Sequence, residues 1–214
     1  MGGATSTRIG GLCGLVAAVV VIPAYLVGTP ESPRTPVEAT RYYDSGSWFV
    51  TANGVLPLLH ILFGLLFLGV LVAVLRAASG PAGAVYVALA GGALYLGLGA
   101  AGFAAEVAVP ATLLRFGDVT VTGFSQPLLT LSVWLYHYSQ VGAAAMIFAS
   151  SVVIWRTGVL PKWTAAGAVL GVLPLLHTWA GLSAAVGSLI WIAGIGLVLL
   201  AVAPRTALAG SVVA

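Results

Sequence analysis

The chain has 214 residues, of which 60% are apolar and only 6% are charged, and its mean hydropathy is +1.11. A soluble domain carries about 25% charged residues, so this composition excludes an ordinary soluble protein. It predicts a single all-α integral membrane domain over residues 1–214. The formal net charge of +3 comes without a basic cluster interleaved with aromatics, which argues against nucleic-acid binding.

Apolar runs of about 20 residues, the length that crosses a bilayer as a helix, recur along the chain. They predict a bundle of six transmembrane helices at about 9–28, 49–76, 82–106, 128–155, 163–181 and 184–203. We interpret the first run as a retained helix, because no clear cleavage site follows it. Only residues 181–183 separate the last two runs, so we expect a tight hairpin there.

The charged residues divide between the two sides of this topology. One side carries basic residues only: Arg8, Arg76, Arg156, Lys162 and Arg205. The other side carries all the acids and three arginines: Glu31, Glu38, Asp44, Glu106, Asp118, Arg34, Arg41 and Arg115. The positive-inside rule makes the first side cytoplasmic. It predicts that both termini are cytoplasmic in a multi-pass protein of the plasma (inner) membrane.

Two predicted outer loops provide most of the surface outside the bilayer. The first, 29–48, contains three prolines and then VEATRYYDSGSW, for which we expect a short interfacial helix. The second, about 107–126, contains LLRFGDVTVTGF and is expected to form a short amphipathic helix or a small hairpin. The loops on the cytoplasmic side are short turns rich in Gly and Pro.

A run of eleven residues, GVLPLLH followed after three residues by Gly, occurs at 54–64 and again at 171–181, with eight identical positions. Each copy brings one proline and one histidine into a predicted span: Pro57 with His60, and Pro174 with His177. A proline frees a backbone carbonyl one turn earlier. Our first interpretation is therefore two kinked helices whose histidines bond the freed carbonyls. The alternative is an inverted 3+3 duplication, as in some transporters.

Three histidines and one carboxylate, from four predicted helices, fall in the outer half of the membrane: His60, His137, His177 and Glu106. Ionisable residues inside a membrane are candidates for functional sites. If these side chains converge, three imidazoles could hold a divalent metal such as zinc, or two could hold haem. Glu106 would then act as an acid–base group or as the partner of a ligand. No local motif such as HxxxH fixes a metal, so the cofactor remains unknown.

Simpler interpretations compete with that site. His137 lies in the sequence WLYHYSQ and fits an aromatic belt at the membrane interface. Small residues at helical spacing predict close helix packing. In the third span they form a stripe with Tyr95 and Glu106: Gly92, Gly99 and Gly102. In the sixth span the equivalent residues are Gly187 and Gly194.

Four short sequences carry a resemblance to a known family. They are RIGGLCGLV at the start of span 1, EATRYY in the first outer loop, LRAASG after span 2 and RTGVLPKW before span 5. With them the chain resembles a widespread set of small, uncharacterised multi-spanning membrane proteins of high-GC actinobacteria. The resemblance implies six spans and an inner-membrane location, and it implies no activity or catalytic residues.

Three functional classes follow. The first is a non-enzymatic ligand-binding, sensor or accessory membrane subunit, with a polar His/Glu layer in the outer leaflet. Its partners would be the lipid bilayer, a small hydrophobic ligand, and a membrane partner subunit or a second copy of the chain. The second is a membrane-embedded enzyme acting on a lipidic or isoprenoid substrate, with metal or haem assistance. The third is a small transporter with an inverted repeat, which the absence of an acid central to any span disfavours.

Overall fold

The computed structural model describes residues 3–27, 46–80, 82–116, 122–176, 179 and 182–202. Within these ranges the chain is helical apart from short turns, and it contains no strand. The α-helices are α1 (Gly3–Val20), α2 (Ile22–Val27), α4 (Gly46–Val50), α5 (Leu56–Ser79), α6 (Gly83–Phe116), α7 (Thr122–Thr157), α8 (Val172–Leu175) and α10 (Leu182–Ala201). A π-helical turn, η1 (Thr51–Val55), precedes α5, and a 3₁₀ helix, η2 (Lys162–Gly171), precedes α8.

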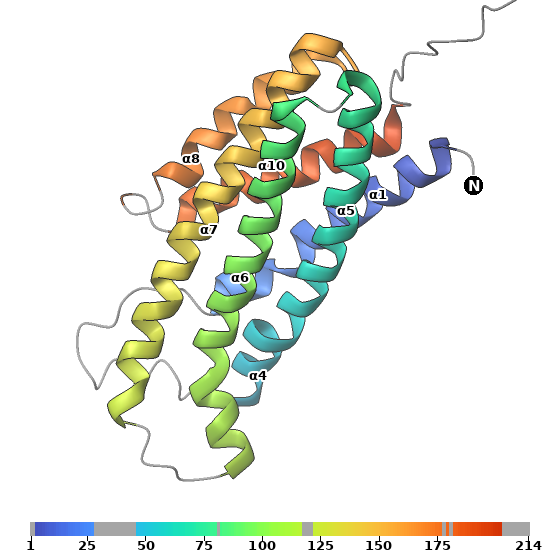
Figure 1. The fold of residues 1–214 in the computed structure, drawn as a ribbon. Coiled ribbons are helices and arrows are strands. Elements are labelled where there is room, and N and C mark those ends of the chain that lie inside the picture. Colours follow the sequence, from blue (N-terminus) through green and yellow to red (C-terminus); the bar gives the residue numbers. More distant parts are fainter. Residues whose placement is uncertain are drawn as a thin grey trace, which may run out of the picture.

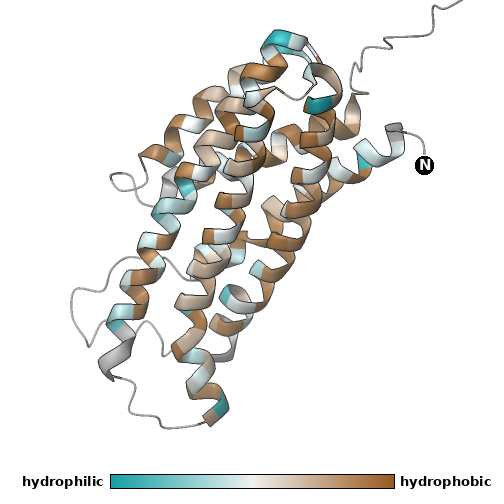
Figure 2. Cartoon of the chain, viewed as in Figure 1, coloured by the Kyte–Doolittle hydropathy of each residue, from teal (hydrophilic) through white to brown (hydrophobic). Residues whose placement is uncertain are grey.

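Four helical segments are long and apolar enough to cross a membrane: Thr5–Leu26, Trp48–Ser79, Gly83–Phe116 and Gln126–Thr157. Two shorter apolar segments follow, Lys162–Leu175 and Ala185–Ala201. Apolar residues dominate along the helices, and hydrophilic colour gathers at the turns (Figure 2). The all-helical class and the first four predicted membrane segments are thus confirmed by length and composition.

The longest helices, α6 and α7, form an antiparallel pair, and α5 lies against the other side of α6 (Figure 1). The 3₁₀ helix η2 packs along α7. The first and last helices, α1 and α10, pack on each other and run obliquely to the α6–α7 pair. The α5–α6 turn and the α7–η2 turn lie together at one end of the bundle, the upper end in Figure 1.

Two helix pairs cross at facing glycines. A Cβ built on Gly91 would lie 2.7 Å from the carbonyl oxygen of Gly142, and one on Gly142 would lie 2.6 Å from that of Gly91. The same reciprocal contact joins α1 to α10, because a Cβ on Gly11 would lie 2.6 Å from the Gly196 oxygen. Backbones therefore touch at both crossings, which is how small residues favour helix association in a bilayer.

The predicted glycine stripes are confirmed in part. A Cβ on Gly92 would lie 2.5 Å from Leu68 of α5, and one on Gly102 would lie 2.9 Å from the Tyr136 ring of α7. Gly99 has nothing within 4 Å of an added Cβ, so it is not a packing residue. In α10 the same division holds, because Gly187 is crowded by Leu173 and Gly194 is open.

Two helices differ from the predicted segments. The helix that contains the predicted third span does not end at 106, because α6 continues through Pro110 to Phe116. The continuation absorbs part of the predicted second outer loop, and Thr112 Oγ1 donates to the Ala108 carbonyl at 2.7 Å in this added stretch. The predicted fifth segment begins as a 3₁₀ helix over Lys162–Gly171 rather than as an α-helix. Most of the first outer loop lies outside the described residues.

Candidate functional site

Glu106 is the only acidic side chain among the described residues, and it is fully buried between α6 and α7. The Tyr136 hydroxyl of α7 donates a hydrogen bond to Glu106 Oε2 at 2.8 Å. The Tyr136 side chain is itself 4% exposed. Burying a carboxyl group is costly unless polar partners compensate it, so this contact joins the two longest helices through a strongly hydrophilic group that needs a partner.

The local sequence makes room for this contact. Gly102 lies one helical turn before Glu106, and its missing Cβ lets the Tyr136 ring lie against the α6 backbone. One turn before Tyr136, Ser132 Oγ donates to the Gly102 carbonyl at 2.9 Å. Two α7 side chains thus hydrogen-bond to one face of α6. Helix-to-helix bonds of this kind contribute about 0.6 kcal/mol each on average in a membrane protein.

A row of aromatic rings extends from this pair toward α2. The Phe103 ring meets the Tyr136 ring edge-on, with centroids 5.1 Å apart and an interplanar angle of 74°. On its other side Phe103 meets Tyr25 of α2, with centroids 6.4 Å apart and an angle of 73°. Edge-to-face rings attract through their quadrupoles. The row therefore couples the segment after α1 to the α6–α7 pair.

His60 lies in α5 and is 3% exposed. Its Nδ1 lies 2.8 Å from the carbonyl oxygen of Ala17 in α1. Because a carbonyl oxygen can only accept, Nδ1 carries the proton and Nε2 keeps its lone pair. The His60 ring also meets the Tyr95 ring of α6 edge-on, with centroids 6.0 Å apart and an angle of 88°. His60 therefore links α5 to two other helices.

The His60 bond corrects one sequence interpretation. We expected the histidine to bond a carbonyl freed by Pro57 of its own helix, and it bonds α1 instead. Pro57 is accommodated differently, as the second residue of α5, where a helix needs no N–H group. The preceding π-turn closes with the Leu56 N–H donating to the Thr51 carbonyl.

Pro174 lies in α8, a single α-helical turn that follows the 3₁₀ helix η2. The chain after it turns tightly, with the Leu176 N–H donating to the Leu173 carbonyl at 2.9 Å. Both repeated prolines therefore lie beside a change in helix type. His177, the histidine of the second copy, lies outside the described residues.

His137 takes a different face of α7 from Tyr136. Its ring meets the Trp134 ring edge-on, with centroids 5.6 Å apart and an angle of 78°. Trp134 and Tyr138 are both exposed, and their rings are 6.0 Å apart. His137 is half-buried in this aromatic group, which matches the interpretation as an interfacial residue.

The predicted metal site finds no counterpart in the part of the chain that the structure describes. There, no group of three or more His, Cys, Asp or Glu side chains could hold a metal ion. Glu106 contacts Tyr136, His60 contacts α1 and Tyr95, and His137 packs on Trp134. A site that includes His177 stays a prediction.

Sequence reasoning missed Asn53, a fully buried residue of the π-turn η1. Neither amide atom of its side chain has a hydrogen-bond partner in the described structure. Its neighbour Gly54 packs against Val107 of α6, one residue beyond Glu106. A signal was present, because Asn53 is the only asparagine of the chain and begins an apolar run. π-Turns recur at functional sites.

Comparisons of the chain with protein-family models, with curated proteins and with solved structures found no match.

Proposed function

We propose that the chain is a six-span protein of the plasma membrane, with both termini in the cytoplasm, that acts as a non-enzymatic ligand-binding, sensor or accessory subunit. The lengths of the two shorter apolar segments support the six-span topology. A 3₁₀ helix rises about 2.0 Å per residue, so η2 and α8 together extend about 26 Å. The 20 residues of α10 extend about 30 Å. Both lengths approach the hydrocarbon thickness of about 30 Å.

The charges support the proposed orientation. Arg76 ends α5, Arg156 ends α7 and Lys162 begins η2. These helix ends meet at the upper end of the bundle in Figure 1. Basic residues gather on the cytoplasmic side of membrane proteins, and the resemblance to the actinobacterial set fits the same arrangement.

Cysteine labelling tests the topology. In a Cys13→Ala background, which removes the only cysteine, single cysteines replace Leu114 near the end of α6 and Thr157 at the end of α7. Both native side chains are exposed. A membrane-impermeant maleimide should label L114C in intact cells and T157C only after permeabilisation. The reverse pattern would overturn the proposed orientation.

The hydrogen bond between Tyr136 and Glu106 is the observation that carries the functional class. An enzyme must present its acid or base to a substrate, whereas the Glu106 carboxyl is fully buried and bonded to a neighbouring helix. His60 is likewise hydrogen-bonded to the Ala17 carbonyl of α1. The polar groups thus act as cross-links of a bundle, which suits a subunit whose role is to bind or to support another molecule.

Native electrophoresis of the full chain, tagged in its own cell and extracted in a mild detergent, tests this class. We expect the chain to carry a second component in fixed ratio, which mass spectrometry identifies as a protein or as a small hydrophobic molecule. A chain that carries neither, and that changes a lipid extract in a manner abolished by Glu106→Gln, would replace the proposal by the enzyme alternative.

A further inference from the structure

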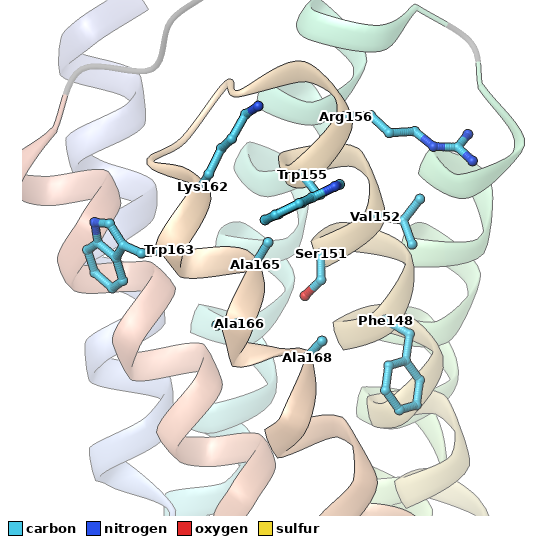
Figure 3. Close-up of a pocket in the computed structure, with 10 residues that line it drawn as sticks. All are labelled: Phe148, Ser151, Val152, Trp155, Arg156, Lys162, Trp163, Ala165, Ala166 and Ala168. Atoms are coloured by element: carbon cyan, nitrogen blue, oxygen red, sulfur yellow. The ribbon is translucent and has the colours of Figure 1, made fainter.

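A groove of about 590 Å³ lies between α7 and η2, next to the turn that joins them (Figure 3). Two cations stand at the end of the groove near this turn, Arg156 from the end of α7 and Lys162 from the start of η2. The rest of the groove is mostly apolar. Its remaining lining residues are Phe148, Ser151, Val152, Trp155, Trp163, Ala165, Ala166 and Ala168.

The cations of the groove have no acidic counterpart in this half of the protein. No Asp or Glu occurs anywhere after Asp118 in the sequence. The Lys162 ammonium lies over the Trp155 ring, 5.7 Å from its centroid, and such a contact leaves the positive charge unneutralised. Both cations are exposed, so an anion bound in the groove would be the first counter-charge within their reach.

The two exposed tryptophans indicate where this end of the groove lies relative to a bilayer. Trp155 is 63% exposed and Trp163 is 69% exposed. Tryptophan concentrates at the headgroup level of membranes. A basic pocket between membrane helices on the cytoplasmic side is the arrangement that binds anionic lipid headgroups.

Ser151 adds a polar group farther into the groove. The residue is 4% exposed, and its hydroxyl has no hydrogen-bond partner among the described residues. Figure 3 shows this oxygen pointing into the space between α7 and η2. Ser151 lies five residues before Arg156, which is about 7.5 Å along an α-helix. Lys162, at the start of η2, is the cation on the same side of α7 as the Ser151 hydroxyl, and the Arg156 side chain points to the other side (Figure 3).

The apolar lining of the groove extends beyond Ser151. Three alanines of η2, at 165, 166 and 168, leave a shallow channel, and Phe148 lies at its far end. A 3₁₀ helix brings side chains three residues apart onto one face, which places Ala165 and Ala168 in a row. A hydrocarbon chain fits such a channel, because it needs contact without polar partners.

We propose that the groove binds an anionic glycerophospholipid of the cytoplasmic leaflet. Its phosphate lies at the Lys162 end of the groove, where Arg156 adds a second positive charge nearby, the Ser151 hydroxyl donates to an ester carbonyl, and one acyl chain follows the alanine row toward Phe148. The charge of the groove selects an anionic over a zwitterionic headgroup. The site goes beyond the proposed function and rests only on its membrane topology, which the cysteine labelling tests separately.

Native mass spectrometry of the full chain, released from detergent in the presence of added lipid, tests the site. The two probes are phosphatidylglycerol and phosphatidylcholine with the same acyl chains. We expect phosphatidylglycerol to bind preferentially. Each cation at a membrane surface is worth about fivefold in affinity, so Arg156→Gln with Lys162→Gln should weaken phosphatidylglycerol binding about 25-fold.

Two further variants separate a built groove from a basic surface. Arg76→Gln removes one cation from the neighbouring α5–α6 turn and should leave the lipid preference unchanged. Ala168→Phe fills the channel without changing the charge and should abolish retention of the lipid, with thermal unfolding confirming that the variant is folded. Equal binding of the two lipids, or phosphatidylglycerol retained by folded A168F, would overturn the proposal.

Discussion

The two copies of GVLPLLH have the same seven residues, and their described parts lie in different helical surroundings. In the first copy, Gly54 and Val55 end a π-turn, and Leu56 begins an α-helix of 24 residues. In the second copy, Gly171 ends a 3₁₀ helix of ten residues, and only one α-helical turn follows. The comparison teaches that the surroundings of this sequence, and not its residues, set the type of helix.

The contacts of each copy explain the difference. The first copy is attached through a side chain, because His60 bonds α1 and packs on α6. The second copy is attached through close packing, because a Cβ on Gly187 of α10 would lie 2.9 Å from Leu173. A tight backbone approach favours the narrow 3₁₀ form on that side, whereas the first copy has a wide π-turn around Asn53.

The same comparison bears on the inverted-repeat alternative. A duplication of three helices would repeat the helices around the motif as well as the motif. Here a π-turn precedes one copy and a 3₁₀ helix precedes the other, and the segments that follow differ in length. The described parts of the two copies thus differ in their neighbouring helix types, and the inverted-repeat transporter stays a prediction.

The largest expected effect comes from breaking the attachment of the second copy. Gly187→Leu would force a side chain against Leu173 and the Leu170 carbonyl, and overpacking of this kind costs about 2–3 kcal/mol. Gly194→Leu on the same helix is the matched control, because nothing lies within 4 Å of its added Cβ. Titration with sodium dodecyl sulfate in mixed micelles measures both. Equal stability of the two variants would remove close packing as the cause.

A smaller decrease in the free energy of unfolding should follow when a contact of α6, the helix on which the first copy packs, is removed. Tyr136→Phe removes the hydroxyl that donates to Glu106, and the strongest hydrogen bonds between membrane helices contribute about 1.7 kcal/mol. Tyr138→Phe, at a side chain that is 56% exposed, should leave the free energy of unfolding unchanged. If Y136F is as stable as Y138F, the buried bond does not hold the pair of helices together.

His60→Leu tests the side-chain attachment of the first copy. The variant loses the bond to the Ala17 carbonyl, for which we expect a destabilisation of about 1 kcal/mol. His137→Leu makes the same replacement at a half-buried ring and should cost less. The same titration measures the free energy of unfolding of both variants. An H60L protein more stable than the original would mean that the His60 hydrogen bond does not stabilise the fold.

The smallest effects should come from the prolines themselves. Pro57→Ala changes a position at the start of α5 where proline costs no hydrogen bond, so the change in stability should stay within about 0.5 kcal/mol. Pro174→Ala adds an N–H group where the helix type changes. We expect the new amide proton at residue 174 of the Pro174→Ala variant to exchange with solvent more slowly than the new amide proton at residue 57 of the Pro57→Ala variant. Faster exchange at 174 would show that the backbone there cannot use the new donor.

The sequence predicted the membrane segments better than their ends or their helix type. Runs of apolar residues indicate how long a membrane helix is, and the helices α5, α6 and α7 contain the predicted runs. The extension of α6 to Phe116 was not predictable from hydropathy, because VAVPATLLRF contains a proline and a charge. The 3₁₀ form of η2 depends on its packing against α10 and α7, which no local pattern encodes.

The sequence named His60 and Glu106 as candidate residues, but it did not indicate Tyr136 or Asn53, nor which side chains meet. His60 and Glu106 are buried as polar groups of a membrane interior should be, yet they contact different partners. The rotation of each helix decides which side chains meet, and one residue along a helix turns a side chain by about 100°. His137 and Tyr136 are adjacent in sequence, yet the Tyr136 ring is buried and bonds Glu106, whereas the His137 ring is half-buried and packs on Trp134.

The crossing of α1 and α10 at Gly11 and Gly196 has a consequence for how the protein is made. The first helix leaves the ribosome long before the helix that packs on it, by about 10 to 40 s at common rates of synthesis. During that time the face of α1 around Gly11 meets only lipid or the insertion machinery. Closure of the bundle is therefore a late event in biogenesis, and truncation before the last helix leaves an open intermediate for quality control.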